Sequence, residues 1–117
     1  MTNFKQLLIW QKGFQITINA IKLIAKFPKE EKFNLSSQIS RAAVSIPSNI
    51  AEGCSRKSPK EFSRFLEIAL GSTFELETQL LIAESADYGD NEIRSQLLKD
   101  IDEEQKMIMS FMRKLTA

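Results

Sequence analysis

Four stretches of the chain repeat apolar residues at the three- and four-residue spacing of an α-helix. They predict helices near residues 3–26, 35–53, 59–87 and 91–115. The 117 residues contain only four glycines and three prolines, which favours a few long elements over many short strands and turns. We therefore expect an all-α protein, a single domain over residues 1–117 that folds as an antiparallel up-down-up-down four-helix bundle.

The first two predicted helices differ in the width of their apolar surface. Two stripes run side by side along the first helix: Phe4, Leu7, Phe14, Ile18, Ile21 and Ala25, interrupted only by Gln11, and then Ile9, Ile16, Ala20, Leu23 and Phe27. Asn3 is its expected cap, and Pro28 ends it. In the second helix Pro47 predicts a kink or break, where Ser45 or Ser48 could satisfy the freed backbone groups. Gly53 is its expected left-handed end.

The third helix has the clearest beginning in the chain. Ser58 is its expected cap, followed by Pro59 at the first helical position and Glu61 at the capping-box position. Its core stripe is broad, and several further apolar residues lie outside it: Phe65, Ile68, Leu70, Phe74 and Leu81. Gly89 is expected to end it, and Asp90 to cap the fourth helix. That helix has a narrow stripe, with acids expected on its outer face: Asp102, Glu103 and Glu104.

One apolar stripe per helix is enough for a monomeric bundle, yet the first and third helices are apolar on more than one side. An additional apolar face exposed to water favours aggregation unless something covers it. Self-association into a homo-oligomer would cover it. The alternative is that these residues only thicken the core.

Composition limits the chemistry available. The chain has no histidine and one cysteine, Cys54, so it lacks Ser-His and Cys-His nucleophile pairs, imidazole metal sites and thiolate zinc sites. Its scattered glycines form no phosphate-binding loop. We expect no enzymatic activity and no cofactor. Apolar runs are too short to span a bilayer, and no signal peptide is evident, so we expect a cytoplasmic protein without membrane contact.

Charge is unevenly distributed along the sequence. Residues 1–64 carry eleven lysine or arginine residues against four acids, whereas residues 65–117 carry five against eleven. Five cations are the candidate nucleic-acid contacts: Arg41, Arg56, Lys57, Lys60 and Arg64. Several of them flank a predicted loop and helix start, whose backbone amides and positive dipole end suit phosphate groups. The alternative is a solvated turn, or neutralisation where the two halves of the chain pack together.

Several motifs resemble one protein family. They are SQISRAAVSIPSNIAEG at residues 37–53, with WQK at 10–12, FPKEE at 27–31, EFSRFLEIA at 61–69, GS at 71–72 and ELETQL at 75–80. Together they resemble the four-helix-bundle proteins encoded by intervening sequences in bacterial 23S rRNA genes. The likeness spans roughly residues 4–90, and the fourth helix matches only in character. Family members often have two arginines where this chain has Ser40-Arg41, a departure that lowers the local positive charge.

The resemblance implies an assembly and a partner. Such proteins resemble ring-forming pentamers, and a relative, the accessory protein of diversity-generating retroelements, works beside a reverse transcriptase and binds nucleic acid through a basic surface. The resemblance thus implies a non-enzymatic homopentamer that binds structured RNA or DNA. The alternative is a structural or protein-interaction scaffold, whose partner would be a reverse transcriptase or another protein. An unrecognised hydrolase is a third reading.

Overall fold

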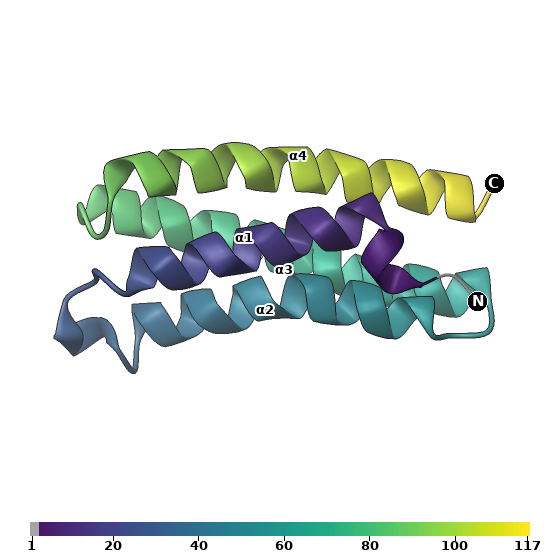
Figure 1. The fold of residues 1–117 in the computed structure, drawn as a ribbon, viewed down its shortest axis with the longest axis horizontal. Helices are drawn as coiled ribbons and strands as arrows, with labels where there is room; N and C mark the ends of the chain where they lie inside the picture. Colours follow the sequence, from purple (N-terminus) through teal and green to yellow (C-terminus); the bar gives the residue numbers. More distant parts are fainter. Residues whose placement is uncertain (1–2) are drawn as a thin grey trace.

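The computed structural model describes residues 3–117 and contains four long helices (Figure 1). These are α1 (Leu8–Ile24), α2 (Leu35–Cys54), α3 (Pro59–Ser85) and α4 (Asn91–Leu115), with 3-10 turns at η1 (Phe4–Gln6) and η2 (Lys29–Glu31). No strand occurs in the described part of the chain. Each helix packs against the one before and after it, and α4 closes against α1, so the expected up-down-up-down bundle is confirmed.

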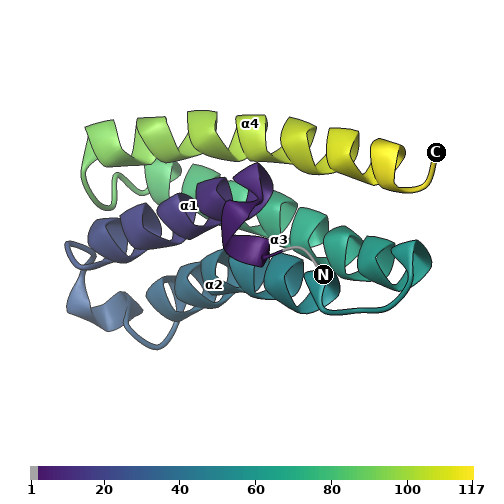
Figure 2. The same cartoon turned by 45° about the vertical axis from the view of Figure 1, so that its right-hand side comes forward.

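The bundle is elongated, about 44 Å long and 20 to 23 Å across. The α1–α2 and α3–α4 loops lie at one end, and the α2–α3 turn lies at the other, on the side of the C-terminus (Figures 1 and 2). None of the helices in the described residues has an apolar stretch of the length needed to cross a membrane.

The core follows the predicted stripes, with one refinement in α1. The second α1 stripe, including Ile16, Ala20 and Leu23, is fully buried. The first stripe faces outward, since Phe14 is 47% and Ile21 48% exposed. Water-facing apolar side chains also occur on α3, as its breadth predicted, and they include Ile68, Phe74, Leu81 and Ile82.

The first helix begins later than predicted. Asn3 accepts a hydrogen bond from the Lys5 amide, but it caps η1, and the backbone is extended at Leu7 before α1 starts. The turn at η1 brings the edge of the Phe4 ring against Trp10, with the ring centroids 5.2 Å apart. This aromatic contact would be lost if the helix continued straight to residue 3.

In α2 the break allowed for at Pro47, the roles expected of Ser45 or Ser48 and the left-handed end expected at Gly53 are all absent. The helix continues unbroken past Pro47 and ends at Cys54. Ser45 and Ser48 are not the donors to the carbonyl that Pro47 frees, because Thr17 of α1 donates to that carbonyl, on Ala43. Gly53 lies inside the helix without a left-handed conformation. Glycine is needed there for space, since a Cβ would lie 2.7 Å from the Cβ of Phe65.

The prediction for Glu104 was also wrong. Its side chain is not on the outer face of α4 but fully buried, between Ile101 and Ile108 in the core stripe. Neither carboxyl oxygen has a hydrogen-bond partner within residues 3–117. Burial raises the pKa of Glu104 to about 8, an effect that the nearby positive charge of Lys12 partly opposes. Burial therefore favours the protonated, neutral form of this side chain.

The loop between α3 and α4 confirms Asp90 as the cap of α4, but α3 ends at Ser85 on a left-handed Asp87 (φ 56°), whose following Tyr88 amide donates to the Ala83 carbonyl, and not on Gly89 as predicted. Gly89 is left-handed, with φ +81°, and Asp90 accepts a hydrogen bond from the Ile93 amide at 2.9 Å. Arg94, which is 3% exposed, donates to the Tyr88 carbonyl at 2.6 Å. This buried guanidinium fixes the loop to the start of α4.

Candidate nucleic-acid interface

The five predicted cations are all exposed, but the fold separates them into two groups. Arg56, Lys57, Lys60 and Arg64 lie together at the α2–α3 turn and the first turns of α3. We call these four residues the basic turn. Arg41 lies thirteen residues before the end of α2. At 1.5 Å per residue this is roughly 20 Å from the basic turn, so Arg41 is not part of it.

The basic turn is held by short local contacts. Ser55 donates its hydroxyl to the Glu52 carbonyl at 2.6 Å, and its amide bonds the same carbonyl at 3.1 Å. Arg56 pairs with the Glu52 carboxylate at 2.9 Å, and its guanidinium lies 4.8 Å from the centre of the Phe65 ring. Part of the Arg56 charge is therefore already balanced inside the subunit.

The other three cations of the basic turn remain available. Lys57, Lys60 and Arg64 form no salt bridge with any described residue. Lys60 and Arg64 are one helical turn apart on the same face of α3. Three unpaired cations around one turn form a compact positive surface for phosphate groups.

The start of α3 is a weaker anion site than its sequence indicated. The predicted cap is confirmed: the Glu61 amide donates to the Ser58 hydroxyl oxygen at 3.2 Å, and that hydroxyl also lies 3.2 Å from the Glu61 carboxylate. Pro59 has no amide to offer. Since one amide is already bonded and a carboxylate stands at the helix end, phosphate contacts here must come mainly from side chains.

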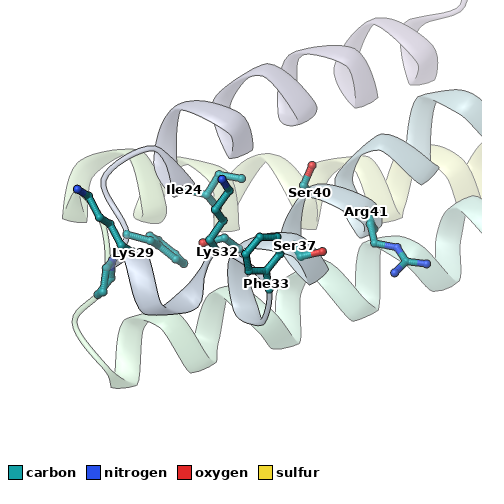
Figure 3. A pocket seen from close by; sticks show the side chains of 10 residues that line it. Ile24, Lys29, Lys32, Phe33, Ser37, Ser40 and Arg41 are labelled. Atoms are coloured by element: carbon teal, nitrogen blue, oxygen red, sulfur yellow. The ribbon is translucent and has the colours of Figure 1, made fainter.

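A second basic region surrounds Arg41 at the opposite end of the bundle. It includes Lys29 and Lys32, which were not among the predicted cations. In the structure the two lysines and Arg41 line one surface hollow (Figure 3). Lys29 and Lys32 belong to the α1–α2 connection, whereas Arg41 belongs to α2. Because the fold brings these cations together, no local pattern in the sequence indicates the group.

The basic and acidic halves of the sequence do meet where α1 packs against α4. Lys12 of α1 lies 3.1 Å from Asp100 and 2.7 Å from Glu103 of α4. The hydrogen bond to Glu103 is the main reason why the pKa of Lys12 is raised. This contact neutralises part of the charge asymmetry, but it involves none of the five candidate cations.

The chain was compared with known proteins. No curated protein matches it. It is similar to a 1.70 Å crystal structure of a protein of unknown function from the S23 ribosomal protein family of Bacteroides thetaiotaomicron VPI-5482. The two are 25% identical with a TM-score of 0.79, and the match covers 90% of this chain and 98% of that one. The family model for the 23S rRNA-intervening sequence protein matches residues 5–110, so this chain belongs to that family.

Proposed function

We propose that the protein is a non-enzymatic homo-oligomer, five-fold on the strength of the family resemblance, that binds structured RNA or DNA through a basic surface. The observation that carries the binding proposal is the basic turn. Its Lys57, Lys60 and Arg64 are exposed and form no salt bridge among the described residues, so phosphates would not have to displace internal partners. Contacts of this kind position a nucleic acid without reading its bases, so sequence preference should be weak.

Assembly is supported by the apolar side chains that the monomer leaves exposed. Phe14 and Val44, which are 47% and 44% exposed, line a shallow groove between α1 and α2 together with the half-buried Trp10 and the buried Pro47. On α3, Phe74 is 49% and Leu81 48% exposed. These are two different surfaces, and an interface that joins two different surfaces is head-to-tail and forms a ring when its rotation closes. A ring would repeat the basic turn in every subunit, so weak contacts would add up along one nucleic acid.

A gel shift with a structured RNA tests the binding proposal. Replacing Arg56, Lys57 and Lys60 by serine should weaken binding without loss of stability, because exposed charges contribute little to folding. A matched control replaces Lys22, Lys99 and Lys106, exposed cations outside the basic turn, by serine and lowers the net charge equally. The control should bind as the parent does. Equal binding by the parent and by the basic-turn variant would show that the basic turn is only a solvated loop and does not contact the RNA.

The alternative is a scaffold that binds proteins and not nucleic acid. The apolar groove between α1 and α2 favours it, because grooves of this kind bind protein helices or neighbouring subunits. A reverse transcriptase is the partner that the resemblance implies. Assembly without any RNA or DNA shift in the experiment above would favour the scaffold.

A further inference from the structure

A surface hollow lies where the α1–α2 loop meets the start of α2. Its volume is about 660 Å³, within the range of small-ligand sites. Figure 3 shows Lys29 and Arg41 at opposite edges, with Lys32 and Phe33 between them. Ten residues line it: Ile24, Phe27, Pro28, Lys29, Lys32, Phe33, Ser36, Ser37, Ser40 and Arg41. The hollow therefore combines an apolar floor, a row of serines and a basic rim.

Phe33 is the most unusual side chain of the hollow. It is 89% exposed, the highest value among the large apolar residues of the described chain. The amino group of Lys32 lies 5.4 Å from the centre of its ring. An aromatic ring held in water beside a cation offers a stacking surface next to a positive charge, which is the combination that single-stranded nucleic-acid sites use.

The start of α2 brings polar groups to the hollow without a side-chain cap. Ser36 lines the hollow and is only 9% exposed. Asn34 precedes α2 without capping it, since its side chain donates to Glu31 instead of accepting from an amide. No described side chain caps the amides in the first turn of α2, and Ser36 and Ser37 of that turn line the hollow. Such groups bind the oxygens of a phosphate.

The rim carries three cations that form no salt bridge within the described chain. Lys29, Lys32 and Arg41 are exposed and pair with no acid among the described residues. Glu30 and Glu31 belong to the same loop but do not line the hollow. A ligand with an anionic group and a flat apolar ring would find cations for its charge and the Phe33 ring for its apolar face.

We propose that this hollow binds one unpaired nucleotide, with its base against Phe33 and its phosphate at Ser36, Lys32 and Arg41. The base has to be unpaired, because bases inside a duplex are stacked on their neighbours and cannot reach an aromatic side chain. The proposal rests on the proposed nucleic-acid function and adds a second contact point. Because the hollow and the basic turn lie toward opposite ends of the bundle, one strand with a paired and an unpaired part can occupy both.

Fluorescence anisotropy with two labelled probes tests the proposal on the full chain: a twelve-nucleotide oligouridine and a blunt RNA duplex. Phe33→Leu removes the aromatic face from a side chain that is 89% exposed, so folding should not suffer. We expect oligouridine binding to weaken about tenfold or more and duplex binding to stay unchanged. Phe33→Tyr keeps the ring and should bind as the parent does. Equal binding of oligouridine by all three proteins would overturn the proposal.

The effect of charge is tested with Lys32→Gln combined with Arg41→Gln. The matched control combines Lys22→Gln with Lys99→Gln, two exposed cations that do not line the hollow. The double variant should weaken oligouridine binding severalfold more than the control does, and an equal effect would contradict a phosphate contact at the rim. Uridine monophosphate should compete with oligouridine at lower concentration than inorganic phosphate. Equal competition by inorganic phosphate would reduce the hollow to an anion site and overturn the nucleotide assignment.

The outcomes for the hollow and for the basic turn can be told apart. If Phe33→Leu has no effect while the basic-turn variant loses duplex binding, the hollow proposal fails and the proposed function stands. If neither probe binds the parent protein, both fail. If oligouridine binding depends on Phe33 while the basic-turn variant binds duplex normally, the hollow stands and the basic turn is only a solvated loop.

Discussion

The hydroxyl of Thr17 on α1 lies 2.9 Å from the carbonyl oxygen of Ala43 on α2. Ala43 is four residues before Pro47, which has no amide to complete the helical hydrogen bond. Thr17 lies 2.9 Å from the Gly13 carbonyl of its own helix as well, so its one proton is shared between the two acceptors. A neighbouring helix thus provides the donor that allows α2 to continue through a proline.

Replacing Thr17 by valine tests this relationship. The variant keeps the shape of the side chain but leaves the Ala43 carbonyl buried without a donor, at a cost of about 1–3 kcal/mol in the free energy of unfolding. Thr17→Ser keeps the hydroxyl and should cost less. Urea unfolding measures both.

A Pro47→Ala background provides the control. There the amide restored at position 47 can bond to Ala43, so Thr17→Val should cost clearly less than in the parent. The same cost in both backgrounds would mean that Thr17 acts only through packing.

Glu104 predicts a dependence of stability on pH. Its folded pKa of about 8 lies above the ordinary value of 4.5, so the folded chain keeps a proton that the unfolded chain has lost between these values. The contribution of Glu104 is therefore fully present below pH 4.5 and declines as pH rises to about 8, by about 1.4 kcal/mol per pH unit.

The measurement is the free energy of unfolding of the parent and of Glu104→Gln at pH 5, 6, 7 and 8. Glutamine does not titrate, so the variant should gain stability relative to the parent as pH rises. The charged groups near Glu104, Lys12 with its partners Asp100 and Glu103, are common to both proteins and cancel in the difference. A difference that does not change with pH would contradict a buried neutral Glu104.

Two glycines should respond to alanine in opposite directions. At Gly89, φ is +81° and a Cβ would lie 2.6 Å from Leu23, so Gly89→Ala should destabilise the fold by about 1–3 kcal/mol. At Gly71, inside α3, a Cβ would meet nothing within 4 Å, so Gly71→Ala should stabilise by about 0.5–1 kcal/mol. Thermal unfolding of the pair checks both signs, and a loss of stability at Gly71 would show that its position needs glycine for another reason.

The starts of α3 and α4 were predictable because their cap signals are local. Ser58 and Asp90 act within one turn of the backbone, and each was found in its predicted role. The end of α3 was not, because Asp87 takes the left-handed position that was assigned to Gly89. Pro47 and Gly53 act through contacts with other helices, with Thr17 and Phe65 respectively. Their roles were therefore mispredicted, because sequence spacing does not tell which helix lies opposite.

The same distinction explains Glu104 and the candidate cations. In the sequence, Glu104 cannot be told apart from Asp102 and Glu103, which are exposed. Only the packing of α1 against α4 shows that Glu104 is buried. Lys57 and Lys60 lie close together because they are close in sequence. Arg41 was predicted to belong to the same group, but it lies toward the other end of the bundle. The hollow at Phe33 was missed because it combines residues of a loop with residues of a helix.

A charge placed in the α1–α2 groove should disturb assembly. Val44 is 44% exposed at this groove, so Val44→Glu should leave the monomer folded while placing an unpaired charge in the proposed subunit interface. Light scattering should give about five times 13.3 kDa for the parent and a smaller mass for the variant. Ser95→Glu, on the exposed face of α4, is the control and should keep the parent mass. A parent mass of 13.3 kDa at micromolar concentration would contradict the assembly proposal.

The central claim, that the basic turn binds phosphates, is tested most directly by the salt dependence of RNA binding. Affinity of the parent for a structured RNA should fall linearly with salt on a logarithmic plot, because each neutralised phosphate releases counterions. Replacing Arg56, Lys57 and Lys60 by serine should reduce that slope by roughly one for each lost contact. The same slope in the parent and in the variant would contradict the claim.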